Sequence, residues 1–229
     1  MIKDPPLLAI RRDFPRPSAE TLAALAGTPT GHAVDAMAGR GALDHRIKPL
    51  APLDGVLVGT AVTCHCGPAD NLALFAALAT ARAGDVLIAA TDGFAGTSVT
   101  GDLLMGMARN RGVGGLVTDG LARDLAGILS VGLPVCCAGL SPNSPARNGP
   151  GTVGLAVVMG GMTVSSGDIV VADNDGVVII PGAEADHVIT RLADVRAAES
   201  ALEAAVKAGL EVPDFIRSVL SSDRVVVIG

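Results

Sequence analysis

The stretch from residue 84 to residue 124 constrains the fold more than any other part of the chain. Two short apolar runs, VLIAA at 86–90 and GLVTD at 115–119, enclose the glycine-rich loop AGTSVTG and the segment DLLMGMAR. Short apolar runs that end in turn residues are typical of buried parallel strands. The helical spacing of apolar residues in DLLMGMAR predicts a helix capped by Thr100, and a second helix is expected to open at Ala122. The stretch therefore predicts parallel βαβ units.

Polar residues gather where these predicted strands end. Asp92 and Asp119 follow the apolar runs, and Asp102, Arg123 and Asp124 fall in the first turns of the predicted helices. Ligands of open α/β sheets bind at this rim. A helix start offers unpaired N–H groups to a carboxylate, the arginine fork suits oxyanions, and carboxylates suit Mg²⁺ or Mn²⁺. The helix dipole alone also favours acids at helix starts. Two acids and an arginine on one rim nevertheless favour a site.

Two further residues are candidates for this rim. VLVGTAVTC at 56–64 predicts a buried strand, and GPADNLALFAALATARAG at 67–84 predicts a helix that begins at Pro68. Asn71 lies in the first turn of that helix, where it either caps the helix or faces the crevice as a partner of water or metal. Arg147 lies in the irregular loop 140–154, where it is either solvated or contacts a second carboxylate of a dianionic substrate.

The four cysteines form two close pairs. Cys64, His65 and Cys66 could suggest zinc, but their spacing is not C-x2-C. Alternation along the predicted strand turns both thiols to one face and the imidazole to the other. Cys136 and Cys137 lie in a further predicted strand, LPVCCAG. We therefore expect buried free thiols rather than a metal site.

The composition of the chain limits which partners and which cellular compartment are expected. The net charge is −6 and Trp and Tyr are absent, so direct binding to nucleic acid is not expected. No run of eighteen apolar residues and no apolar leader segment occurs, which predicts a cytoplasmic protein without a membrane span. A length of 229 residues suits one large domain. We expect this domain at 1–182, with a proline-rich arm at 1–16 on its surface or on a neighbouring subunit, and a helical extension at 183–229.

The remaining segments complete a layered α/β architecture. Helices are expected at 18–27, with Ser18 as N-cap, and at 28–39. From 152 to 181, short apolar runs alternate with Gly-Gly and Asn-Asp-Gly turns, which predicts a second β layer with Asp173 and Asp175 in structural turns. A long amphipathic helix is expected from Ala183, followed by a shorter helix and a final strand, RVVVIG.

Asp102 and the Arg123-Asp124 pair, separated by twenty residues, resemble the signature of a known family. GDLLMGMARNRGVGGLVTDGLARD, DNLALFAALATARAGDVLIAA and SSGDIVVADNDGVVIIP also resemble it, so the similarity extends from about Thr30 to Pro181. The family is that of the 4-hydroxy-4-methyl-2-oxoglutarate/4-carboxy-4-hydroxy-2-oxoadipate aldolases, which share their fold with bacterial ribonuclease activity regulator A proteins. The resemblance implies a layered β/β/α fold and homotrimers or homohexamers with sites near subunit interfaces.

The resemblance also implies an activity and roles for the rim residues. The expected reaction is class II pyruvate aldol cleavage, with oxaloacetate decarboxylation as a side activity through the same enolate. Asp124 would bind Mg²⁺ or Mn²⁺ directly and Asp102 through water, while Asp102 also orients a metal-bound water as base and Arg123 stabilises the enolate. The oxo-acid substrate would further contact Asn71, Arg147 and the backbone of the helix start, at Gly101, Asp102, Leu103, Leu104 and Met105.

Two rival functions remain open at this point. A non-catalytic regulator that binds and inhibits a ribonuclease shares the fold and the acidity, but the resemblance implies that such regulators lack the complete acid set. A methyltransferase is suggested by the glycine-rich loop, yet no G-x-G-x-x-G follows a strand. The crevice segment contains no lysine, so a Schiff-base mechanism has no obvious nucleophile.

Overall fold

The structure is a computed structural model that describes residues 4–228. Within them the chain forms two compact units, the first up to Leu192 and the second from Ala193 onward. The division therefore falls inside the long helix that begins at Ala185. All residues of the predicted rim belong to the first unit.

A mixed nine-stranded sheet forms the centre of the first unit. Its middle strands, β3, β4, β6 and β8, run parallel, and β9 and β2 flank them in antiparallel orientation. The predicted parallel βαβ units are thereby confirmed. The strands of this sheet are β1 (Leu8–Ile10), β2 (Lys48–Pro49), β3 (Leu57–His65), β4 (Val86–Ala90), β6 (Gly115–Thr118), β8 (Val135–Cys137), β9 (Gly151–Val153), β12 (Ile169–Asp173) and β13 (Gly176–Ile180).

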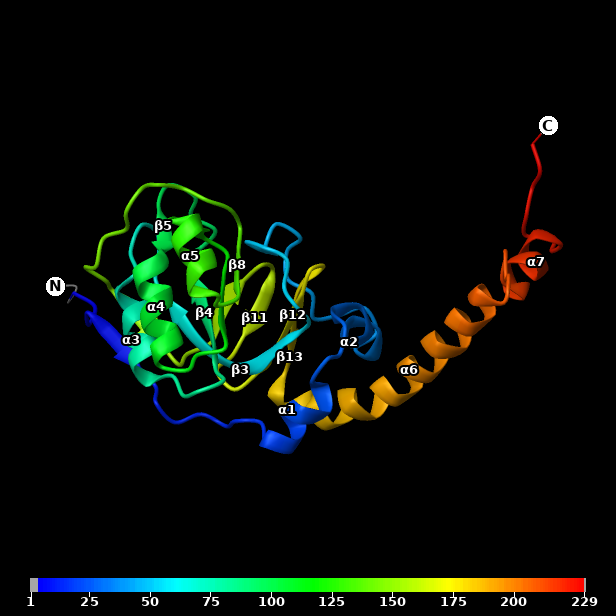
Figure 1. Cartoon of the computed structure of the whole chain (residues 1–229), viewed down its shortest axis with the longest axis horizontal. Helices are drawn as coiled ribbons and strands as arrows, with labels where there is room; N and C mark the ends of the chain where they lie inside the picture. The colour runs from blue at the N-terminus through cyan, green and yellow to red at the C-terminus, as the bar shows by residue number, and fades with distance from the viewer. Residues whose placement is uncertain (1–3, 229) are drawn as a thin grey trace. The chain divides into compact units, whose positions relative to one another are not determined.

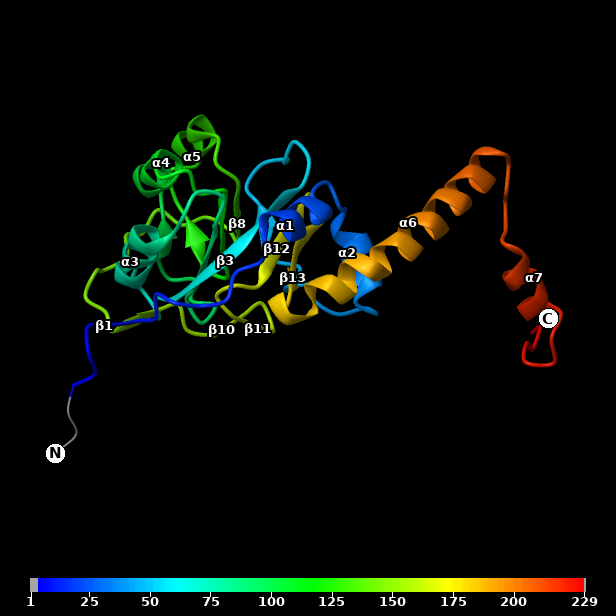
Figure 2. The same cartoon turned by 90° about the horizontal axis from the view of Figure 1, so that it is seen from below.

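Helices cover one face of the middle strands and further strands cover the other. Figure 1 shows the helices α3 (Leu72–Thr80), α4 (Asp102–Asn110) and α5 (Leu125–Val131) on one side and the strands of the second β layer on the other. That layer consists of β12 and β13, which continue the sheet from the first half of β3, and of the hairpin β10 (Val157–Met159) with β11 (Met162–Val164). Figure 2 shows this hairpin on the side away from α4 and α5. The predicted β/β/α layering is confirmed.

Burial of both faces explains why the middle strands are continuous apolar runs. Along β4, Leu87 packs in the core under the helices, together with Leu74 and Met105. Its neighbour Ile88 points the other way and packs against Ile179 of the second β layer. Because successive side chains of a strand alternate between faces, a strand between two layers needs apolar residues at every position.

Part of the N-terminal segment forms an edge strand of the sheet. Leu8–Ile10, within the predicted surface arm at 1–16, pair in parallel with Gly151–Val153 of the same chain; residues 1–3 lie outside the described part. The helices α1 (Ala19–Leu25) and α2 (Thr30–Ala36) follow as predicted. The Ser18 hydroxyl accepts a hydrogen bond from the Thr21 N–H at 3.1 Å, so the predicted cap is confirmed.

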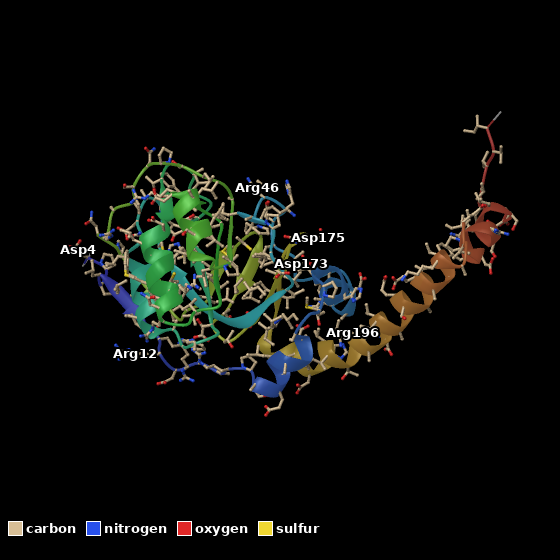
Figure 3. The ribbon with its side chains drawn as sticks, viewed as in Figure 1. Asp4, Arg12, Arg46, Asp173, Asp175 and Arg196 are labelled. Carbon is tan, nitrogen blue, oxygen red and sulfur yellow. The ribbon has the colours of Figure 1, made fainter. Side chains whose placement is uncertain are left out.

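Asp173 closes the second layer onto α2. Its carboxylate accepts hydrogen bonds from the Thr30 N–H at 2.8 Å and the Thr30 hydroxyl at 2.7 Å, and Figure 3 shows it with Asp175 near the turn that leads into β13. Burial acts to raise the pKa of Asp173, but the donors from Thr30 and from the N–H groups of Asp175 and Gly176 outweigh it and lower the pKa below its usual value. The predicted structural role of Asp173 is confirmed, although the residue is the last of β12 and does not lie in the turn itself.

Two predicted helix starts are wrong by three or four residues, and one predicted N-cap is wrong by one residue. The helix after β3 begins at Leu72 rather than Pro68, because the Asp70 carboxylate accepts from the Leu72 N–H at 2.8 Å and caps the helix there. Thr100 does not cap α4, since it belongs to the strand β5 (Ser98–Thr100). The segment Leu121–Ala122 forms the strand β7, and so α5 starts three residues later than Ala122.

The C-terminal segment is helical. After the 3-10 turn η1 (Gly182–Glu184) come the predicted long helix α6 (Ala185–Lys207) and the shorter α7 (Asp214–Leu220). The predicted strand RVVVIG is wrong for residues 224–228, which contain no strand. Val226, Val227 and Ile228 are 83–90% exposed, and no neighbouring strand among the described residues supplies hydrogen bonds for pairing. No helix within residues 4–228 is long and apolar enough to cross a membrane.

Candidate functional site

A small parallel pairing of β5 with β7 brings the two halves of the Asp102 and Arg123-Asp124 motif together. Ser98 pairs with Leu121 and Thr100 with Ala122, and the Arg123 N–H donates to the Thr100 carbonyl at 3.0 Å. The twenty residues between the halves form α4, β6 and the turn that returns the chain to β5. The twenty-residue spacing of the motif is therefore the length of chain needed to form one helix, one central strand and the turns that join them.

The motif opens into a cavity of about 320 Å³ at the start of α4. Acidic, basic, neutral polar and apolar side chains all contribute to its wall. The structure brings all the predicted site residues except Met105 to this wall. The lining residues are Asn71, Phe75, Ser98, Thr100, Gly101, Asp102, Leu103, Leu104, Met107, Arg123, Asp124, Ser144, Pro145 and Arg147.

Asp102 is the first residue of α4 and its carboxylate lies over α5. One oxygen, Oδ1, accepts from the Leu103 N–H at 2.7 Å. The other, Oδ2, lies so close to Gly127 of α5 that a Cβ there would be only 2.4 Å away. Glycine at position 127 thus makes room for the carboxylate, and the helix pair α4–α5 sets its position.

Asp124 has a left-handed backbone, with φ of 59° and ψ of 45°, at the N-cap of α5. Such values are uncommon for residues other than glycine and recur at functional sites, although aspartate tolerates them better than most residues. Its Oδ2 lies 3.1 Å from Arg123 Nε, and a Cβ on Gly101 would meet the same oxygen at 2.6 Å. The Arg123 guanidinium also donates to the Ser144 hydroxyl. Glycine 101 therefore admits an ion pair that is partly exposed to the cavity.

The start of α4 adds backbone donors. In the described part of the chain, no acceptor meets the N–H groups of Asp102 and Leu104, as is typical of a helix start. The Leu103 N–H is already bonded to the Asp102 carboxylate. The Met105 N–H donates to the Gly101 carbonyl at 3.1 Å, and the residue is completely buried in the core. The prediction that Met105 contacts a substrate is therefore corrected, because its N–H already belongs to the helix ladder.

Asn71 does not cap its helix. Asp70 performs that role, while Asn71 Nδ2 donates to the Val99 carbonyl at 3.0 Å. Asn71 Oδ1 and Thr100 Oγ1 are buried and have no hydrogen-bond partner among the described residues. Thr100 was not among the predicted site residues, yet it lines the cavity. The one sequence feature that could have indicated Thr100 is the alternation in Ser98-Val99-Thr100, because in a strand it places two hydroxyl side chains on one face.

Arg147 closes the opposite wall of the cavity. Its guanidinium lies over the Phe75 ring, 4.9 Å from the centroid, and is thus held by an aromatic face rather than by a carboxylate. Asp70 anchors the loop that carries it, since its Oδ2 accepts from the N–H groups of Asn148 and Gly149. The arginine fork is therefore positioned beside the cavity with donors to spare.

The donor set fits a magnesium or manganese ion. Within residues 4–228 no cluster of three or more His, Cys, Asp or Glu side chains could hold a metal. Mg²⁺, however, is usually bound through one or two carboxylates, with water and substrate oxygens completing its shell. Asp124 and Asp102 supply two such carboxylates on one cavity, and glycines 101 and 127 leave them room. A zinc site, by contrast, usually takes four Cys, His or acid ligands.

The other acids of the rim form hydrogen bonds with backbone N–H groups or with a histidine. Asp119 accepts hydrogen bonds from the N–H groups of Thr91 and Gly93, and so fixes the loop after β4. Asp92 Oδ1 lies 2.9 Å from His65 Nε2. Neither acid lines the cavity.

The cysteines are buried free thiols, as predicted. Cys64 and Cys66 lie with their sulfurs 3.9 Å apart in the core, and their contact together with burial raises the pKa of Cys64 well above its usual value. Burial, with smaller effects of the neighbouring Cys137 thiol and the Asp173 carboxylate, raises the pKa of Cys136 to about 12.

Comparison with known proteins places this chain in a family. A family model described as RraA-like, Aldolase/RraA, matches residues 30–179. The chain belongs to the RraA-like family. It is 33% identical over 178 residues to a protein of Halalkalibacterium halodurans named "Putative 4-hydroxy-4-methyl-2-oxoglutarate aldolase", and the match covers 78% of this chain and 84% of that relative. The family resemblance inferred from Asp102, Arg123 and Asp124 is therefore confirmed.

Solved structures of RraA-like proteins share the fold. Streptomyces coelicolor RraAS2, described as an unusual member of the RNase ES inhibitor RraA protein family, superposes with a TM-score of 0.74 at 27% identity, over 83% of this chain and 99% of that one. A Geobacillus kaustophilus protein named S-adenosylmethionine: 2-dimethylmenaquinone methyltransferase superposes with a TM-score of 0.62 at 26% identity, over 67% of this chain and 95% of that one. The names attached to this one fold thus cover three different functions.

Proposed function

We propose that this RraA-like protein is a divalent-metal-dependent pyruvate aldolase. Its substrate would be 4-hydroxy-4-methyl-2-oxoglutarate or 4-carboxy-4-hydroxy-2-oxoadipate, with oxaloacetate decarboxylation as a side activity. The observation that carries the proposal is the wall of one cavity, where Asp102, Arg123 and Asp124 meet free helix N–H groups. The 33% identity to the Halalkalibacterium protein of that name supports it.

Different residues of the cavity suit different groups of the substrate. The N–H groups of Asp102 and Leu104 suit the carboxylate next to the 2-oxo group, because a helix start favours negative charge. Asp124, with Asp102 acting through water, would hold Mg²⁺ or Mn²⁺, which when bound supplies Lewis acidity to the 2-oxo group. Arg147 suits the distal carboxylate, since its fork is free to form paired hydrogen bonds.

Cleavage breaks the bond between C3 and C4 of the substrate. The C4 hydroxyl loses its proton to water that the Asp102 carboxylate orients, and C4 becomes the carbonyl carbon of the second oxo acid. The electron pair of the broken bond passes to C3 and yields the enolate of pyruvate. Arg123 donates hydrogen bonds to the developing oxyanion, an interaction worth roughly 3–4 kcal/mol when a single such donor is removed. Protonation of C3 then releases pyruvate.

Pyruvate release from purified protein tests the proposal directly. We expect turnover of 4-hydroxy-4-methyl-2-oxoglutarate that EDTA abolishes and that Mg²⁺ or Mn²⁺ restores. Asp124→Ala should weaken the affinity for the metal, so that excess Mg²⁺ rescues part of the turnover. Arg123→Ala should lower kcat by about 10²–10³-fold without rescue, because it removes a donor to the oxyanion but no metal ligand. Near-normal turnover of folded Arg123→Ala would overturn this assignment of the site.

A non-catalytic regulator of a ribonuclease is the second candidate, and the superposition on RraAS2 favours it. Such a protein needs a docking surface but no metal-binding cavity. It would release no pyruvate from any of these acids, and Arg123→Ala would leave its binding to a ribonuclease unchanged unless the arginine lies in the interface. The pyruvate assay therefore separates the two candidates.

A further inference from the structure

Two polar atoms of residues that line the cavity have no hydrogen-bond partner within residues 4–228, and they differ in what they can bind. Asn71 and Thr100 are 4% and 2% exposed, and no group among the described residues meets Asn71 Oδ1 or Thr100 Oγ1. Buried polar atoms without partners are unfavourable and are therefore uncommon in folded proteins. Both residues line the cavity that contains Arg123 and Asp124.

The hydrogen bond of Asn71 settles which amide atom is free. Nδ2 donates to the Val99 carbonyl at 3.0 Å, and a flipped amide would instead set two oxygens against each other. The free atom is therefore the oxygen, which can only accept. Because Asp70 already caps α3 at the Leu72 N–H, the helix makes no use of this oxygen.

The strand β5 directs Thr100 to the same side as the cavity. Val99 packs into the core, so alternation turns Ser98 and Thr100 the other way, and both line the cavity. Ser98 Oγ donates to the Asn143 carbonyl at 2.8 Å, whereas Thr100 Oγ1 remains free to donate and to accept. The bond from Asn71 to Val99 sets the free amide oxygen beside the peptide that precedes Thr100.

We propose that Asn71 and Thr100 form a hydroxyl-binding pair that selects substrates carrying a hydroxyl group. In the bound substrate, Thr100 Oγ1 donates to the oxygen of the hydroxyl and Asn71 Oδ1 accepts its hydrogen, until cleavage passes that hydrogen to the water that Asp102 orients. Both atoms are shielded from water in the free protein, so substrate binding requires the Thr100 hydroxyl to rotate toward the cavity and the Asn71 amide to tilt about its hydrogen bond to Val99. The inference rests on the proposed function, in which this hydroxyl is the C4 hydroxyl of a 4-hydroxy-2-oxo acid. Oxaloacetate in its keto form has no such group, and the pair is idle during its decarboxylation.

Thr100→Val, with Thr100→Ser as its matched control, tests the pair. Valine keeps the shape of threonine but removes a hydroxyl that has no partner in the fold, so the melting temperature should not fall. We expect kcat/KM for 4-hydroxy-4-methyl-2-oxoglutarate to fall about 10- to 100-fold, and that for oxaloacetate to change by less than about 3-fold. Thr100→Ser should retain the preference for the hydroxylated substrate. Asn71→Asp, which keeps an acceptor, should retain more of that preference than Asn71→Leu.

Equal loss of both activities in Thr100→Val, or loss of neither, would overturn the hydroxyl-binding pair. If the wild-type protein cleaves neither substrate, the proposed function fails, and the hydroxylated acid then survives long enough for calorimetry. In that case tighter binding of 4-hydroxy-4-methyl-2-oxoglutarate than of 4-methyl-2-oxoglutarate by wild type, lost in Thr100→Val, would still support the pair. Equal binding of the two acids by wild type would refute it.

Discussion

Replacing Gly127 by alanine moves the Asp102 carboxylate without removing it. A Cβ at position 127 would lie 2.4 Å from Asp102 Oδ2 and 2.6 Å from Asp102 Cβ. Ordinary contact begins at 3.4 Å, so the start of α4 or the side chain of Asp102 must shift by about 1 Å. A misplacement of about 1 Å can lower turnover about 10²-fold. We therefore expect Gly127→Ala to lower kcat for pyruvate release by about two orders of magnitude.

The same substitution should leave the protein folded. Alanine in a helix is more favourable than glycine by about 0.8–1 kcal/mol, whereas overpacking typically costs about 1–3 kcal/mol. The net loss is then at most about 2 kcal/mol, which corresponds to a fall in melting temperature of about 4–8 °C in a chain of this size. Circular dichroism at the assay temperature should show native helix content.

Gly106→Ala provides the matched control. Gly106 lies in α4, and a Cβ there would meet no atom within 4 Å. It should raise the melting temperature by about 2–4 °C and leave kcat unchanged, because it gains helix propensity without a clash. Steady-state pyruvate release and its dependence on Mg²⁺ concentration would be measured for both variants. Wild-type kcat and metal dependence in Gly127→Ala would refute the role given to Asp102.

Three further outcomes follow from the burial, charge and exposed surfaces of the chain. At pH 8 the native thiols should resist alkylation and all four should react after denaturation, because a pKa of about 12 leaves Cys136 only about one part in 10⁴ as thiolate; rapid reaction of the native protein would contradict this. Thr30→Val should reduce stability at pH 7 but progressively less below about pH 4. The lowered pKa of Asp173 means that its contribution is present above the unfolded-state pKa and is lost as pH falls, and a pH-independent difference in urea titrations would contradict it. Light scattering should show a trimer or hexamer, since Phe215, Leu220 and other apolar side chains of the second unit are exposed; a monomer at micromolar concentration would refute the assembly.

The local pattern of the chain was sufficient for the central layers. β4 and β6 are predictable because a strand covered on both faces must be apolar at every position, and that requirement is written in consecutive residues. Asp102, Arg123 and Asp124 are predictable for a related reason, since they lie in the connections that follow such strands, at the expected starts of the next helices. The layering and the family could therefore be inferred from the sequence.

Sequence reasoning failed where a hydrogen-bond partner comes from a distant segment. In the sequence Thr100 resembles a helix cap. Pairing of β5 with β7 instead places it in a strand, and Gly101 is the N-cap residue of α4. Asn71 looks like a cap as well, yet Asp70 takes that role and leaves the amide oxygen free. No local pattern distinguishes these cases, because capping residues and strand-end residues are chemically the same.

The sequence by itself determined the central strands, the helices that cover them and the charged groups in the connections that follow these strands. Those properties depend on the period of apolar residues and on the residue types at turns, both of which are local. Only the tertiary structure decided which groups of the cavity are free for a ligand. Asp119 and the Met105 N–H are already bonded within the fold, whereas Asn71 Oδ1 and Thr100 Oγ1 are not. The availability of a polar group depends on every neighbour within hydrogen-bonding distance, and those neighbours come from parts of the chain that meet only when it folds.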